Sequence, residues 1–273
     1  MKRITLLLLV LLAGCDRQDT HPWLGYVEGE NAFVSAPQAG WVARVAVTRG
    51  DWVKTGDLLF TLDDINQAAV RDQANAAIAL AQSQRIAAEA NLELTRKELA
   101  RQANLLALNA GTKQAYDVAK ASYESAAAQV SQIDAQIAQA RATLSGAAYQ
   151  LSERDVVART TGRVQDVYFR AGEYAPAMTP VVAVLPPQNI YVRFFVPETE
   201  FAHVKLGQRV AITCDGCAPN VTAAVTFIAQ QEEFTPPVIF SEDNREKLVF
   251  KVEARAPGGL RLNPGQPVEV RPL

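Results

Sequence analysis

Two cysteines three positions apart, Cys214 and Cys217 in the segment TCDGC, have the side chains best suited to covalent chemistry. A CxxC pair can close a disulfide, bind a metal or exchange thiols with a partner. A structural zinc site needs a second pair of ligands, and no histidine lies at a suitable spacing. A redox motif of the thioredoxin type lies in a βαβ pattern, which does not surround this pair. We predict a disulfide that closes a turn, with free thiols and redox or metal chemistry as alternatives.

The remaining reactive residues do not form a catalytic constellation. His21 and His203 are isolated in the sequence. Glu232 and Glu233 are adjacent, so in a strand their side chains would point to opposite faces. There is no phosphate-binding glycine loop and no GxSxG elbow. We therefore expect that the protein is not an enzyme and that it holds no catalytic metal.

One lysine lies in a suggestive setting, the stretch GDWVKTGDLLFTLD that runs from Gly50 to Asp63. Two Gly-Asp pairs bracket a short apolar run, and Lys54 lies between them. This is the pattern of a lipoyl or biotinyl carrier domain, in which one lysine carries a cofactor arm. Mass spectrometry of Lys54 would test that hypothesis.

The N-terminus reads as a lipoprotein signal peptide at residues 1–14. Two basic residues precede a short apolar run that is far below the ~20 residues needed to span a bilayer. The run ends in LAGC, which resembles a bacterial lipobox that leaves Cys15 as a lipidated first residue. The alternative is an ordinary cysteine near a standard cleavage site. Asp16 resembles the enterobacterial signal for inner-membrane retention, so we expect a periplasmic protein anchored to the inner membrane through Cys15.

The composition is that of a globular protein without a nucleic-acid footprint. The chain has 273 residues, a net charge of -2 and 49% hydrophobic residues. No proline occurs between Pro37 and Pro176, and more than a quarter of residues 64–154 are alanine, the best helix former. Gly111 and Thr112, near the centre of this segment, suit a helix C′ position and a helix N-cap. We predict two antiparallel helices joined by a very short turn.

The second of these helices has a regular apolar seam, and the first has a less regular one. Spacings of three and four alternate without a break in the second helix, which is the heptad pattern of a coiled coil. In the first helix, Arg85, Thr95 and Gln102 interrupt the seam. A helical pair packed inside a globular domain is the alternative. The seam of the second helix consists of Tyr116, Ala119, Tyr123, Ala126, Val130, Ile133, Ile137, Ala140, Leu144, Ala147 and Leu151, and that of the first consists of Ala74, Ile78, Ala81, Ala88, Leu92, Leu99 and Leu106.

The segments on either side of the helices are copies of each other. APQAGWVARVAVTRGDWVKTGDLLFTL, from Ala36, aligns without a gap with ARTTGRVQDVYFRAGEYAPAMTPVVAV, from Ala158, at an offset of 122 residues. Gly50 falls on Gly172. Each copy alternates apolar and polar residues around a Gly-acid turn, which predicts strand, turn and strand. After the second copy, short alternating segments punctuated by glycines predict a small β-barrel over residues 188–273.

This order of segments resembles the HlyD-like periplasmic adaptor family, also called membrane fusion proteins, in a short lipoprotein form. The resemblance implies an elongated α+β fold, with a split lipoyl-like β-sandwich, an inserted coiled-coil hairpin and a small β-barrel. In this family the two half-motifs pair to rebuild one sandwich, so we expect no cofactor, and Lys54 is expected to be an unmodified turn residue. The expected segments are the linker 15–25, the first half-domain 26–63, the hairpin 64–154, the second half-domain 155–187 and the barrel 188–273.

In many members of the family, the hairpin tip carries Arg, six residues, Leu, three residues and Ser, which engage a TolC-type outer-membrane channel. Arg101, Leu108 and Thr112 fall on the same spacing here, with threonine in place of serine. The resemblance implies that these three residues contact the channel. The alternative interpretation is that Arg101 is a solvated residue, that Leu108 packs the end of the coil and that Thr112 is a simple cap.

The resemblance also implies partners. These are an inner-membrane transporter, a TolC-type channel and further copies of the chain in a ring, often a hexamer. Adaptors of RND-type pumps usually carry a further membrane-proximal domain, whereas this chain ends at LNPGQPVEVRP, so we expect an ABC-type exporter. The alternative function is that of a structural envelope lipoprotein whose coiled coil binds a partner. Nucleic acid is not an expected partner.

Overall fold

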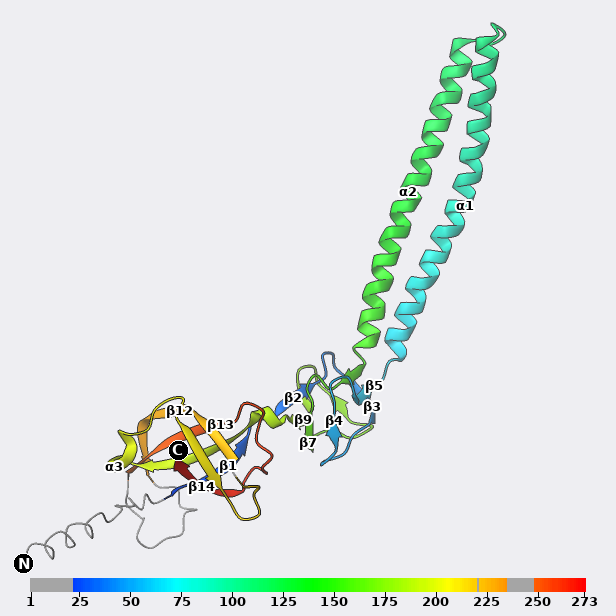
Figure 1. The fold of residues 1–273 in the computed structure, drawn as a ribbon. Coiled ribbons are helices and arrows are strands. Elements are labelled where there is room, and N and C mark those ends of the chain that lie inside the picture. Colours follow the sequence, from blue (N-terminus) through cyan, green and yellow to red (C-terminus); the bar gives the residue numbers. More distant parts are fainter. Residues whose placement is uncertain (1–21, 220, 235–247) are drawn as a thin grey trace, which may run out of the picture. The chain divides into compact units, whose positions relative to one another are not determined.

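The computed structural model describes residues 22–219, 221–234 and 248–273. Contacts divide the chain into two compact units. One consists of Phe33–Ala183, and the other consists of Val184–Leu273 together with the residues up to Ala32. Figure 1 shows two small sheets and a helical hairpin in the first unit and a barrel in the second.

The first unit contains the predicted sandwich as two four-stranded sheets, ordered β2-β9-β7-β4 and β6-β5-β3-β8. Each half of the repeat gives its shortest strand to the other half: β4 pairs with β7, and β8 pairs with β3. The bounds are β2 (Ala32–Ser35), β3 (Gly40–Val45), β4 (Trp52–Val53), β5 (Leu58–Leu62), β6 (Asp155–Val157), β7 (Gly162–Val167), β8 (Tyr174–Ala175) and β9 (Pro180–Leu185).

The two copies of the repeat make the same contacts across the sandwich. Gly50 N donates to Val164 O at 2.8 Å, and its counterpart Gly172 N donates to Val42 O at 2.8 Å. Gly50 has φ 93° and Gly172 has φ 89°, a backbone conformation that glycine adopts readily. Neither half can bury its apolar face alone, so the exchanged strands and paired hydrogen bonds make the two halves one folding unit. The predicted split sandwich is confirmed.

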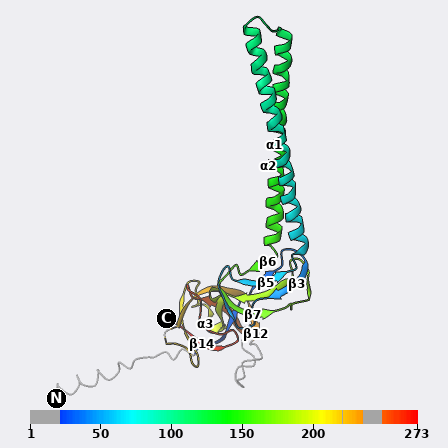
Figure 2. The same cartoon turned by 90° about the vertical axis from the view of Figure 1, so that its right-hand side faces the viewer.

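Helices α1 (Ile65–Ala107) and α2 (Lys113–Ser152) form the predicted hairpin. They run side by side in both views of Figures 1 and 2. At 1.5 Å per residue, the longer arm reaches about 65 Å. Every seam position predicted in α2 is buried or half-buried, so the heptad prediction is confirmed.

The polar interruptions of the α1 seam are also half-buried, and each has a hydrogen-bonding partner. Arg85 Nε lies 2.6 Å from Asp134 Oδ1 of α2, which ties the two helices together. Thr95 donates to the backbone within its own helix, and Gln102 donates to Glu98. These side chains therefore interrupt the apolar pattern without leaving the seam.

The loop at the end of the hairpin differs from the prediction at one residue. Thr112 is the N-cap of α2, and its hydroxyl accepts from Ala115 N at 3.1 Å. The left-handed residue after α1 is Asn109 (φ 55°), whereas Gly111 was predicted to take that role. Asn109 and Ala110 donate to carbonyls of the last helical turn, the pattern of a Schellman motif. Glycine suits position 111 for a different reason, which is the lack of space for a side chain. An added Cβ there would lie only 3.1 Å from atoms of the preceding turn.

The second unit is a closed six-stranded barrel in the order β1-β10-β13-β12-β11-β14. Its interior is apolar and includes Val27, Phe194 and Ile212. The bounds are β1 (Trp23–Gly29), the short helix η1 (Pro187–Asn189), β10 (Ile190–Pro197), α3 (Glu198–Phe201), β11 (Arg209–Thr213), β12 (Val221–Phe234), β13 (Leu248–Arg255) and β14 (Pro267–Pro272).

Strand β1 corrects one predicted boundary. Residues from Tyr26 onward were expected in the first half-domain and residues 15–25 in a linker. Instead, β1 pairs with β10 and β14 in the barrel. Trp23 is buried and stacks on Phe194 at 5.6 Å between ring centroids. Burial of this aromatic surface fixes β1 in the barrel, although its alternating pattern would have suited either domain.

Candidate functional site

The tip of the hairpin carries an apolar side chain that lies mostly in solvent. Leu108 follows the last residue of α1 and is 76% exposed. The Schellman hydrogen bonds and the Thr112 cap fix the backbone on both sides of it. A rigid loop that displays a leucine loses little conformational entropy on binding, so the tip suits contact with a partner.

Arg101 lies two turns before Leu108 on the same helix. Residues seven apart in a helix lie on nearly the same side, so Arg101 and Leu108 share a face. The Arg101 guanidinium contacts Glu98 at 2.6 Å, and the side chains are 66% and 41% exposed. Exposed ion pairs of this kind contribute little to stability, about 0–1 kcal/mol. Arg101 can therefore exchange this partner for an acceptor on another molecule at small cost.

A groove of about 680 Å³ runs along the hairpin next to the tip, between α1 and α2. Leu94 and Val118 line it and are both more than half exposed. Thr112 also contributes to its wall. Leu94 lies seven residues before Arg101, so Leu94, Arg101 and Leu108 form one stripe along α1.

Leu94 and Val118 were not among the predicted site residues. The signal that could have found them is their position, because both are large apolar residues that fall outside the three-four seam. An apolar residue off the seam of a two-helix coil cannot be buried by its partner helix. Such residues indicate a surface available to another molecule.

The other predicted site residues belong to other elements or lie outside the described residues. Cys15 and Asp16 fall outside the part of the chain that the structure describes. Lys54 is exposed in the turn between β4 and β5, where its N–H donates to Asp57. Cys214 and Cys217 are joined by a disulfide after β11 in the barrel unit. Within the described part of the chain, the structure thus brings Arg101, Leu108 and Thr112 together at the tip, and Cys214 and Cys217 together in the barrel unit.

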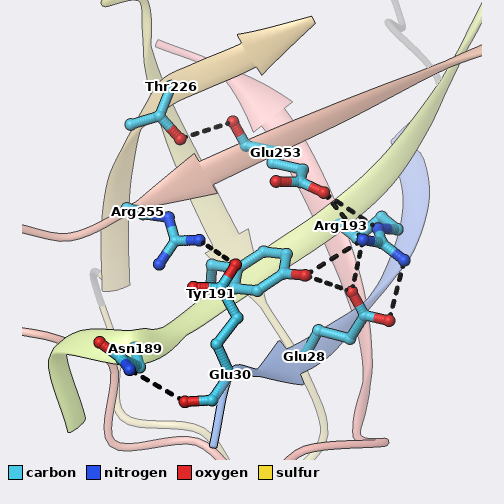
Figure 3. A network of polar contacts seen from close by, with 8 residues as sticks. All are labelled: Glu28, Glu30, Asn189, Tyr191, Arg193, Thr226, Glu253 and Arg255. Carbon is cyan, nitrogen blue, oxygen red and sulfur yellow. Dashed lines mark hydrogen bonds and ion pairs between the residues drawn. The ribbon is translucent and has the colours of Figure 1, made fainter. Parts of the chain in front are cut away.

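A polar network on the barrel, shown in Figure 3, holds strands β1, β10 and β13 together. Arg193 contacts Glu28 at 2.8 Å and Glu253 at 2.8 Å. The Tyr191 hydroxyl donates to Glu28 at 2.6 Å, and the Arg255 guanidinium lies over the Tyr191 ring. Burial, together with the bond to Glu28, raises the pKa of Tyr191. The phenol therefore stays a neutral donor, and the network is a structural clamp.

Comparison with known proteins identifies the hairpin and the fold. Residues 77–153 match the family model described as RND MFP, alpha-helical hairpin domain. The Multidrug export protein EmrA of Escherichia coli is 28% identical over 222 residues, which are 70% of this chain and 57% of EmrA. A UPF0194 membrane protein of Acidithiobacillus ferridurans is 31% identical over 129 residues, 46% of this chain and 38% of that protein. The chain thus spans about half the length of these curated relatives.

A solved structure has the same fold over nearly the whole chain. MacA from Actinobacillus actinomycetemcomitans superposes with a TM-score of 0.70 and 21% identity, covering 92% of this chain and 77% of MacA. The chain therefore has the same fold as MacA, and its hairpin matches the hairpin domain of membrane fusion proteins. None of the helices within the described residues combines the length and apolarity that a bilayer crossing requires.

Proposed function

We propose that this protein is the periplasmic adaptor subunit of a tripartite export system. It would link an inner-membrane transporter to a TolC-type outer-membrane channel, and it would have no catalytic role of its own. The observation that carries this proposal is the exposed Leu108 at a rigidly capped tip, at the end of a hairpin of about 65 Å.

The proposed contact with the channel combines three features of the tip. Leu108 offers apolar surface, Arg101 offers a charge with only a weak internal partner, and Thr112 fixes the start of α2. Burial of a leucine of this exposure is worth about 1.5–3 kcal/mol. Several hairpins side by side in a ring would multiply this weak contact, because linked contacts act at a high effective concentration.

Anchoring and transporter class are part of the proposal. We propose that Cys15 is lipidated and that Asp16 retains the protein at the inner membrane. An ABC-type exporter is the proposed transporter, and an RND-type permease is the alternative that the description of the matched hairpin model favours. Affinity purification of the chain from membranes distinguishes the two, since only the first would co-purify with an ATPase.

An export assay tests the role of the tip. Arg101→Asp and Leu108→Ser are expected to raise the sensitivity of cells to an exported compound as much as deletion of the gene does. Arg96→Asp is the matched control, because Arg96 also forms an exposed i,i+3 ion pair, with Glu93 at 2.7 Å, but lies outside the tip stripe. If both tip variants are folded, reach the envelope and export normally, the tip assignment is wrong.

A further inference from the structure

The barrel unit has a cavity of about 810 Å³ that the adaptor function does not use. It opens on the outer face of the barrel, over β1 and β14. Residues that alternate with the buried core positions of these strands form much of its lining. The full lining is Leu24, Gly25, Tyr26, Phe195, Thr213, Cys214, Asp215, Gly265, Pro267, Val268 and Glu269.

One wall of the cavity is aromatic. The rings of Tyr26 on β1 and Phe195 on β10 lie 6.2 Å apart and are tilted by 37°. Tyr26 pairs with Pro267 across the two strands, and Leu24 pairs with Glu269, so the apolar surface continues onto β14. Apolar walls with a few polar groups are typical of small-molecule sites.

The charged residues of the lining are two carboxylates, Asp215 and Glu269. Asp215 is exposed and forms no ion pair within the described residues. Glu269 lies 3.8 Å from Arg271, and both side chains are about half exposed, so this pair is weak. The nearby Arg193 does not oppose a bound cation, because Glu28 and Glu253 already neutralise it, as Figure 3 shows.

The turn that carries Asp215 is fixed in place. The disulfide joins the two ends of Cys214–Cys217, and Cys217 N donates to Cys214 O at 3.1 Å. Gly216 supplies the positive φ, 78°, that this turn needs. The Gln266 amide donates to Cys214 Sγ at 3.3 Å and to Asp215 O at 3.5 Å. The backbone at Asp215 is thus held at the rim of the cavity, so that binding has to order only the Asp215 side chain.

We propose that this cavity binds a small organic cation with an aromatic body. The body would lie against Leu24, Tyr26 and Phe195, and the charge would face Asp215 and Glu269. Aromatic faces attract cations, and carboxylates in a partly desolvated site favour a positive ligand over a neutral or negative one. The site goes beyond the adaptor function and can be tested without any transport assay.

The test is a titration of the full chain in phosphatidylcholine nanodiscs with ethidium, followed by fluorescence anisotropy, with empty nanodiscs as the blank. Wild-type protein is expected to bind ethidium above the blank. Asp215→Asn combined with Glu269→Gln should weaken binding at least about tenfold, equal to about 1.4 kcal/mol. Asp117→Asn combined with Glu124→Gln is the matched control, since it removes two exposed carboxylates from the hairpin and should bind as wild type does.

Two further measurements keep the outcome decisive. Leu24→Arg adds a positive charge at a partly exposed position of the wall and should also abolish binding without loss of the fold. Tetraphenylphosphonium should displace ethidium, whereas neutral triphenylphosphine oxide of similar shape should not. Absence of wild-type binding above empty nanodiscs, or equal binding by the carboxylate variant and the wild type, would overturn the proposal.

Discussion

At the residue scale, the most informative side chains are those that the hairpin does not bury. Leu94 and Leu108 face solvent on α1 at the heptad positions on either side of Arg101. The seam residues explain how the hairpin holds together, but they do not explain this second stripe. A stripe that is mostly exposed is available for a partner, and this is why the tip carries the proposed function.

Gly56 provides a prediction about a single backbone position. Its φ is 94°, and an added Cβ would meet nothing within 4 Å. Gly56→Ala should therefore lower the free energy of unfolding of the sandwich by about 1 kcal/mol, through backbone strain alone. Urea denaturation, followed by the fluorescence of Trp41 and Trp52, measures this change.

Gly146→Ala is the control for that measurement. An added Cβ at Gly146 also has open space around it, but the residue lies inside α2. Alanine there should stabilise the helix by about 0.5–1 kcal/mol. Urea denaturation gives the change in the free energy of unfolding for each variant. Changes of the same sign in the two variants would contradict the assignment of strain to Gly56. The equivalent position in the second copy of the repeat is Met178, which also has positive φ, 62°.

At the scale of elements, the outer face of α1 provides a prediction about pH. A hydrogen bond from Arg96 lowers the pKa of Glu93 from 4.5 to about 2, with smaller contributions from the Arg96 and Lys97 charges. A carboxylate whose pKa is lower in the folded state stabilises above the unfolded pKa. This stabilisation is present above about pH 4.5 and is lost as the pH falls towards 2.

Thermal unfolding at 222 nm, at pH 5 and pH 2.5, checks this expectation. The fall in melting temperature between the two values should be larger for the wild type than for Glu93→Gln, which cannot titrate at that position. Because the pair is exposed, 0.5 M salt should reduce the difference. Identical pH dependence in the two proteins at low salt would show that Glu93 contributes nothing to it.

The elements also show what the sequence alone can predict. The α2 seam follows from local spacing, since burial on one face imposes a period that can be read directly. The repeat follows from the gapless alignment of two segments at an offset of 122 residues. The exchange of β4 and β8 cannot be read in this way, because it depends on pairing between strands far apart in the chain. The same holds for the cavity beside Tyr26, whose lining comes from four strands and two turns.

At the scale of the whole molecule, the two half-domains depend on the return of the hairpin to its starting point. Removal of one heptad from each arm, residues 85–91 and 128–134, keeps the seam in register because Arg85 lies opposite Asp134. The double deletion should fold with an intact sandwich and a hairpin about 10 Å shorter. Circular dichroism and tryptophan fluorescence should show one cooperative transition for the hairpin and sandwich.

Removal of residues 85–91 alone is the contrasting variant. It leaves one heptad of α2 without a partner, so the tip should fray and the helical signal should fall by more than in the double deletion. An equal helical signal per residue in both deletions would contradict the view that each arm stabilises the other along the seam.

The central claim is that the hairpin tip contacts an outer-membrane channel, and crosslinking in intact cells tests it most directly. A photoreactive amino acid would replace Leu108 at the tip or, as a control, Tyr149, which is 64% exposed near the other end of α2. We predict a crosslink to a TolC-type channel from position 108 and none from position 149. Crosslinks from position 108 that contain only scaffold proteins of the envelope would contradict the claim and favour a structural lipoprotein.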